Sequence, residues 1–127
     1  MIRIVYLCSL LLFTQFARAA DWPQWQGPDR TNVSQETGLL SSWPEGGPQQ
    51  VWASSEAGLG YAGLAVVGET LYTLGARGEQ EFLIALNVSD GSEKWSTAIS
   101  DLLTNNWGDG PRSTPTVVGE LVYALSG

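Results

Sequence analysis

A nine-residue segment of this chain returns, largely unchanged, 51 positions later. Residues 66–74 read VVGETLYTL, and residues 117–125 read VVGELVYAL. A repeat of roughly 40–50 residues is typical of units that stack against their own copies and bury a shared core. The second copy reaches Gly127 before it arrives at counterparts of Gly91 and Trp95. We therefore expect the chain to end inside a repeated unit.

The repeated unit is predicted to consist of short β-strands. Runs of aliphatic, β-branched and aromatic residues alternate with Gly, Asp, Asn and Ser, and no stretch after residue 50 has a helical period. The predicted strands are residues 51–53, 63–67, 71–74, 82–86, 94–99, 114–118 and 121–125. Four antiparallel strands per unit correspond to one blade of a β-propeller. The expected fold class is therefore all-β, a partial β-propeller of four-stranded antiparallel blades, truncated in its second blade.

Turn residues separate these strands. Gly68-Glu69 and Gly119-Glu120 each lie between two paired strands, and glycine at the first loop position favours a two-residue type II′ hairpin. Asp90-Gly91 predicts a further turn. Trp52 and Trp95 are 43 residues apart, against 51 for the repeated segments, so eight extra residues fall within residues 101–110. Insertions in a repeat map to loops, often on the binding face.

Residues 21–50 form an irregular lead-in, rich in Pro, Gly, Gln and Ser. This segment contains Trp22, Trp25 and Trp43. Because burial of an indole removes roughly 150–250 Å² from water, we expect these side chains to pack against the rest of the molecule. An aromatic platform for sugars or quinones is the alternative interpretation.

The N-terminus has the order of a secretory signal peptide. Arg3 precedes an apolar stretch at residues 4–16, and small residues follow up to Ala20. A membrane anchor is the alternative, but the stretch is shorter than the ~20 apolar residues that span a bilayer. We therefore predict a signal peptide at residues 1–20, a secreted or periplasmic location, and no membrane span after cleavage.

Charge and composition exclude several classes of function. Without residues 1–20 the chain keeps four basic residues against thirteen acidic ones, a net charge of −9. Nucleic acid is excluded as a partner, because its binding rests on Lys and Arg that neutralise phosphates. The chain has no histidine, and its only cysteine, Cys8, lies in the predicted signal peptide. Ser-His-Asp and Cys-His arrangements are therefore excluded within this sequence, and a zinc site could use only carboxylates.

Residues 85–95, ALNVSDGSEKW, resemble the tryptophan-docking motif of the pyrroloquinoline-quinone-type (PQQ-like) propeller repeat. Ala85, Asn87, Gly91 and Trp95 match the motif, and Asp90 stands where the family has Thr. In that motif the turn lays the indole between neighbouring blades, where main-chain groups meet its N–H. The resemblance covers residues 51–127, about one and a half four-stranded blades.

The lead-in resembles the start of secreted, planctomycete-type members of this family, through residues 21–28 (DWPQWQGP) and 43–48 (WPEGGP). The family includes quinone-dependent alcohol dehydrogenases, in which the cofactor lies on the blade axis beside a calcium ion. It also includes non-enzymatic propellers that only bind partners. The resemblance thus implies a fold more firmly than an activity.

Three residues in or beside the insertion are candidates for cofactor binding. Arg112 could offer a bidentate cation to the carboxylates of a quinone, or it could pair with Asp109. Asp109 lies between two glycines and could be a calcium ligand, a base or a solvated turn residue. Trp107 could face a ligand or cover a blade edge. Glu79 and Glu81, by contrast, are expected in a solvated loop.

Two functions are compatible with these features. The first is an exported, non-catalytic propeller that binds a protein or a small ligand. The second is the N-terminal part of a quinone-dependent alcohol or polyol dehydrogenase, with PQQ and calcium as its cofactors. A propeller closes with about four blades or more. In either case we expect the remaining blades to come from C-terminal sequence beyond residue 127.

Overall fold

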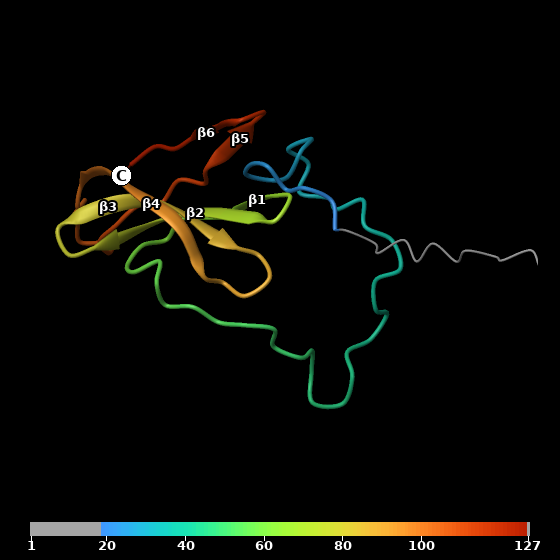
Figure 1. Cartoon of the computed structure of the whole chain (residues 1–127). Helices are drawn as coiled ribbons and strands as arrows, with labels where there is room; N and C mark the ends of the chain where they lie inside the picture. Colours follow the sequence, from blue (N-terminus) through green and yellow to red (C-terminus); the bar gives the residue numbers. More distant parts are fainter. Residues whose placement is uncertain (1–18, 127) are drawn as a thin grey trace, which may run out of the picture.

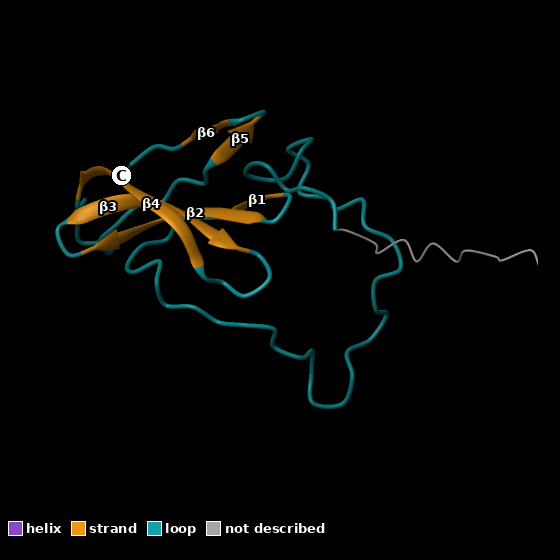
Figure 2. Cartoon of the chain, viewed as in Figure 1, coloured by secondary structure: helices purple, strands orange, loops and turns teal. Residues whose placement is uncertain are grey.

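The structure, a computed structural model, describes residues 19–126. The predicted signal peptide lies outside these residues, apart from Ala19 and Ala20. The described chain is all-β, with a four-stranded and a two-stranded antiparallel sheet and no helix (Figures 1 and 2). Consequently, residues 19–126 hold no helix that is long and apolar enough to cross a bilayer.

The four-stranded sheet is a simple antiparallel meander. Its strand order is β1-β2-β3-β4, so every strand pairs with its neighbour in the chain. The strands are β1 (Ala65–Val67), β2 (Thr70–Arg77), β3 (Gln80–Asn87) and β4 (Glu93–Asp101). The second sheet is a hairpin of β5 (Thr116–Val118) and β6 (Leu121–Tyr123).

The sequence repeat is also a repeat of structure. Ala65 of β1 lies opposite Tyr72 of β2, and Thr116 of β5 lies opposite Tyr123 of β6. Each residue of the second pair is 51 positions after its counterpart, so the two hairpins share one register. Turn geometry pins this register, because a slip of one residue would turn every side chain to the opposite face.

Glycine permits both hairpin turns. Gly68 and Gly119 have φ of 59° and 60°, while Glu69 and Glu120 keep ordinary negative values. A positive φ at the first loop residue alone is the signature of the type II′ turn, as predicted. The predicted turn at Asp90-Gly91 is confirmed as well, since it joins β3 to β4 with φ of 72° at the glycine.

The core is centred on β3. Successive side chains of a strand point to opposite faces, yet the run from Leu83 to Leu86 is buried without interruption. Both faces of β3 are therefore covered. The buried hydrophobic residues are Ala65, Leu74, Ala76, Leu83, Ile84, Ala85 and Leu86. Full burial of such an aliphatic side chain contributes about 1.5–3 kcal/mol.

The segment before β1 completes the free edge of β2. The short β1 pairs only with the start of β2, and Leu59 pairs with Ala76 near its end through N–O contacts of 2.9 and 2.7 Å. Gly75 makes this approach possible, because a Cβ atom there would lie 1.8 Å from the carbonyl oxygen of Ala57. Backbone groups that would otherwise stay unpaired on β2 are thus satisfied.

The lead-in is irregular, but its first residues join the two sheets. Trp22 exchanges two backbone hydrogen bonds with Val66 of β1, both of 2.8 Å, and the Val117 N–H of β5 donates to the Pro23 carbonyl at 2.8 Å. The indole of Trp22 also packs on Gly27. The lead-in therefore lies along the first strands of both sheets.

Packing of the lead-in tryptophans is confirmed only for Trp22. Trp25 is 63% exposed and Trp43 is 70% exposed. The later part of the lead-in runs as a long loop that stands away from the strands (Figure 1). Both indoles are therefore mostly exposed within the described residues.

The predicted strand boundaries need correction. Residues 51–53 form no strand and pair with none of the strands among the described residues. Ladder pairing carries β2, β3 and β4 beyond the predicted ranges 71–74, 82–86 and 94–99. Residues 63–64, 114–115 and 124–125 lie outside the strands predicted to contain them.

Candidate binding site

The inserted loop follows directly after β4, and its two ends are tied together. The Leu102 N–H donates to the Glu79 carbonyl at 2.9 Å, and the Gly110 N–H donates to the Leu103 carbonyl at 2.9 Å. The loop is therefore closed at its base. We call residues 102–110 the inserted loop.

The inserted loop is braced by two of its own side chains. Asp109 Oδ1 accepts the Asn105 N–H at 3.1 Å, and Asn105 Oδ1 accepts the Trp107 N–H at 2.8 Å. Asp109 is exposed, and Trp107 is more fully so, at 89%. The predicted aromatic residue thus lies at the tip of a hydrogen-bonded loop without packing on either sheet.

Arg112 holds the end of the inserted loop. Its Nη1 donates to the Gly110 carbonyl at 3.0 Å, and its Nη2 donates to the Gly108 carbonyl at 2.6 Å. The guanidinium lies 5.1 Å from the centroid of the Tyr61 ring, in range for a cation–π interaction. Two carbonyls and an aromatic face therefore hold Arg112, and Asp109 is not its partner.

A shallow hollow of about 410 Å³ lies beside this cluster. Residues 58–61 form one wall, and Asp109 forms the other. Tyr61 comes close to the loop because Gly108 has no side chain; a Cβ atom there would lie 2.3 Å from the tyrosine oxygen. Of the three predicted residues, only Asp109 lines the hollow. Arg112 lies over the Tyr61 ring without lining the hollow, and Trp107 lies outside the hollow.

Glu81 is the residue that sequence reasoning missed. Its side chain is fully buried, although a solvated loop was expected; Glu79 is exposed, as expected. Glu81 Oε1 accepts the Leu103 N–H at 3.0 Å, and Oε2 accepts the Ser100 hydroxyl at 3.4 Å. A register shift in the β3–β4 ladder falls at this residue, which the sequence does not signal. Glu81 thus anchors the base of the inserted loop.

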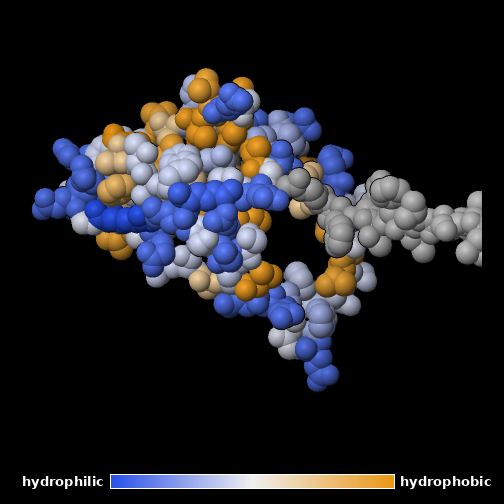
Figure 3. Space-filling model, in the orientation of Figure 1, coloured by the Kyte–Doolittle hydropathy of each residue, from blue (hydrophilic) through white to orange (hydrophobic). Residues whose placement is uncertain are grey.

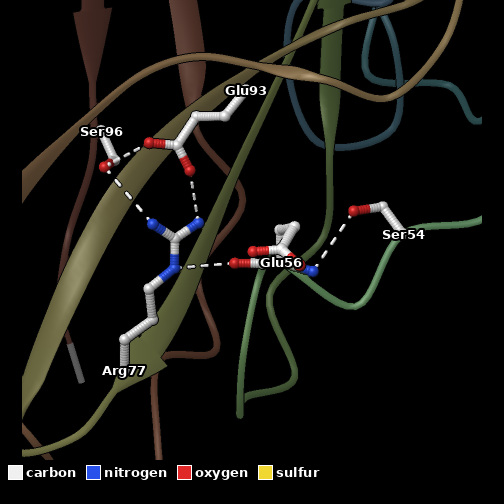
Figure 4. Close-up of polar contacts among 5 residues, drawn as sticks. All are labelled: Ser54, Glu56, Arg77, Glu93 and Ser96. Carbon is white, nitrogen blue, oxygen red and sulfur yellow. Dashed lines mark hydrogen bonds and ion pairs between the residues drawn. The ribbon is translucent and has the colours of Figure 1, made fainter.

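A second polar cluster lies on the sheet around Arg77 (Figure 4). Arg77 Nη2 contacts Glu93 Oε2 at 2.6 Å, and its Nε donates to the Glu56 carbonyl at 2.7 Å. The Ser96 hydroxyl donates to Glu93 Oε1 at 2.7 Å. The hydrogen bonds from Arg77 and then from Ser96 lower the pKa of Glu93. The cluster ties the segment before β1 to β2 and β4, so its role is structural.

Trp52 packs on the turn between β3 and β4. Its indole N–H donates to the Val88 carbonyl at 2.7 Å, and its six-membered ring lies against Gly91. The turn is held by Asp90, whose carboxylate accepts the backbone N–H of Ser92 at 2.9 Å and its hydroxyl at 2.6 Å. These bonds lower the pKa of Asp90. Trp52 lies in a segment that forms no strand, and it contacts the sheet through its indole.

Trp95, 43 residues later, has a different environment. Its ring centroid lies 6.1 Å from that of Tyr72 at an interplanar angle of 55°. The residue is 41% exposed. Trp95 thus contacts its own sheet on one side and presents the other to solvent.

No family model, curated protein or solved structure matches this chain. Within residues 19–126, no group of three or more Asp, Glu, Cys or His side chains is placed to hold a metal ion. The candidate site is therefore defined by the inserted loop, the hollow and their hydrogen bonds.

Proposed function

We propose that this chain is the first part of an exported β-propeller that acts as a binding or scaffold protein. The observation that carries the proposal is the position of Trp107, an indole 89% exposed at the tip of the inserted loop. The loop is braced by Asp109 and Arg112, so binding would cost little ordering. Tryptophan is also enriched at the residues that dominate protein–protein binding energy.

The propeller part of the proposal is supported by Trp52. This residue precedes the first sheet, yet its indole packs on the turn of that sheet. The PQQ-like repeat uses its tryptophan in this way between successive blades. By the same spacing, Trp95 would pack on the corresponding turn of the next blade. That blade would contain β5 and β6 and be completed by sequence beyond residue 127.

The edge of the second sheet at β6 supports the proposal that further strands complete it. β6 has β5 as its only strand partner among the described residues. Leu121 is 60% exposed and Tyr123 is 56% exposed. Figure 3 shows hydrophobic residues gathered over this hairpin. An exposed apolar edge is a template for pairing with another strand, which the rest of the blade would supply.

The alternative is the N-terminal part of a quinone-dependent alcohol or polyol dehydrogenase, and Asp109 at the hollow is the observation in its favour. The described residues do not fit a calcium–quinone site. Calcium takes six to eight oxygen ligands, and Asp109 is the only carboxylate in the lining of the hollow. Arg112 is also turned to the carbonyls of its own loop. We therefore derive no step through that cofactor.

Site-specific photo-crosslinking in the exporting host tests the binding proposal. A photo-reactive residue in place of exposed Asn106 should give one defined adduct in the full-length protein. The additional change Trp107→Ala should remove most of it. The same photo-reactive residue at exposed Glu120, distant from the inserted loop in sequence, is the control. An adduct that survives Trp107→Ala would contradict a role for the indole.

A cofactor test separates the two functions. Purified full-length protein is mixed with PQQ and Ca²⁺, and quinone uptake and alcohol-dependent dye reduction are measured. The binding protein should retain no quinone and reduce no dye. Stoichiometric uptake with dye reduction would instead establish the dehydrogenase.

A further inference from the structure

The end of the predicted signal peptide offers two candidate cleavage bonds. Signal peptides are cut after an A-x-A-like pattern of small residues. Ala17 and Ala19 supply that pattern, so the bond between Ala19 and Ala20 fits it. A cut after Ala20 would instead put Arg18 at the first position of the three-residue pattern, where a small residue is required. The sequence pattern therefore favours the earlier bond.

Backbone and side-chain contacts of the described residues begin at the same point. The Ala20 N–H donates to Oε1 of Glu36, in the lead-in. Asp21 Oδ1 then accepts the Gly68 N–H at 2.8 Å, and the backbone of Trp22 pairs with β1. Ala19 and Ala20 are both exposed, so the bond between them is accessible.

We propose that the signal peptide is removed at the Ala19–Ala20 bond and that Glu36 binds the new α-amino group. Water adds across the bond: its hydroxyl goes to the Ala19 carbonyl carbon, and its proton goes to the Ala20 nitrogen. The carboxyl group formed on Ala19 then ionises, and the nitrogen takes up this second proton, so the former amide becomes an ammonium group that is charged at neutral pH. The hydrogen bond from an uncharged amide to the Glu36 carboxylate thereby becomes an ion pair, in which both donor and acceptor carry charge.

The surroundings of Ala20 favour a positive charge. Glu36 and Asp21 line one small hollow beside it, and Asp21 and Glu69 line another. The charged side chains that line these two hollows are all carboxylates. An ammonium group at this position would face negative charge from the lead-in and from the β1–β2 turn.

The first test identifies the mature N-terminus, and it rests on the export in the proposed function. The full chain is produced in a secreting bacterium, and the exported product is analysed by mass spectrometry. The expected first residue is Ala20. A product that begins at Asp21 would overturn this inference and leave export intact. An uncleaved chain that begins at Met1 would overturn both.

Two leucine substitutions then locate the bond by its requirement for a small residue. Ala19→Leu should reduce the cleaved fraction several-fold, because it fills the position just before the cut. Ala20→Leu is the matched control and should be cleaved as the unchanged chain is. The reverse pattern, with Ala20→Leu blocked and Ala19→Leu cleaved, would place the cut after Ala20 and overturn the inference.

Amine labelling tests the role of Glu36. The exported chain has two amine groups, the α-amino group and Lys94, so Lys94 is an internal reference. Near neutral pH, Glu36→Gln should accelerate acylation of the α-amino group roughly two- to fivefold relative to Lys94, the range for a surface ion pair. Glu45→Gln, in the exposed part of the lead-in, should leave the ratio unchanged. An unchanged ratio in Glu36→Gln would refute capture by this carboxylate.

Discussion

At the scale of single residues, the inserted loop is held by polar side chains that bond to its own backbone groups. Glu81 fixes its base, Asp109 closes its middle and Arg112 holds its end. Arg112 and Asp109 had been candidates for a quinone and a calcium ion. Their observed partners are backbone groups of the loop itself, and Trp107 is exposed at its tip.

Removal of the buried carboxylate of Glu81 should loosen this loop. Glu81→Ala leaves the Leu103 N–H without its acceptor, a loss of about 1–3 kcal/mol for a buried donor. Chemical denaturation followed by circular dichroism measures this loss. Glu79→Ala, two residues earlier and exposed, is the control. Equal stability of the two variants would show that Glu81 does not anchor the loop.

The ion pair between Arg77 and Glu93 should make stability depend on pH. Hydrogen bonds from Arg77 and then from Ser96 lower the pKa of Glu93 from the ordinary 4.5. A lowered pKa in the folded state contributes stability above the unfolded value, and this contribution is lost as pH falls through the folded value. Glu93→Gln should therefore lower the denaturation midpoint at neutral pH and have no effect well below pH 4.5. A midpoint difference that persists in acid would contradict this origin.

At the scale of elements, the turn between β3 and β4 is the contact point for Trp52, and Gly91 makes that contact possible. Gly91 has φ of 72°, and a Cβ atom there would lie 2.5 Å from the indole. Gly68 has φ of 59° but nothing within 4 Å of the same atom. The two glycines share a positive φ and differ in whether a ring lies beside them.

Alanine substitutions at these glycines separate the two effects. Gly68→Ala should cost about 1–2 kcal/mol for the left-handed backbone alone. Gly91→Ala should cost more and displace Trp52, which a change in tryptophan fluorescence would report. If Gly91→Ala is no more harmful than Gly68→Ala, the packing of Trp52 contributes little.

Local patterns in the sequence predict the two hairpins. Strand formation at residues 51–53 and the burial of Glu81 depend on contacts between distant parts of the chain. The repeated VVGE segments predict both type II′ turns and their shared register. Residues 51–53 have a strand-like sequence and form no strand, because a strand also needs a partner and none of the described strands pairs with them. Burial of Glu81 depends on a bulge and on the return of the inserted loop. No local pattern of residues encodes either.

At the scale of the whole molecule, the four-stranded and two-stranded sheets leave apolar side chains exposed. Leu121 and Tyr123 line the edge of β6, and Trp95 presents one face to solvent. Residues 20–127 produced alone should therefore self-associate in sedimentation equilibrium. Leu121→Lys should shift them toward monomers, because charge on an edge strand opposes pairing. A monomer at every concentration would show that the edge needs no partner.

The central claim is that indoles 43 residues apart join successive four-stranded sheets. The most direct measurement is an experimental structure of this chain extended by its downstream coding sequence. We predict that Trp95 donates its indole N–H to a main-chain carbonyl in the β3–β4-type turn of the next sheet, as Trp52 does to Val88. A solvent-exposed Trp95, or a downstream segment that folds into helices, would contradict the claim.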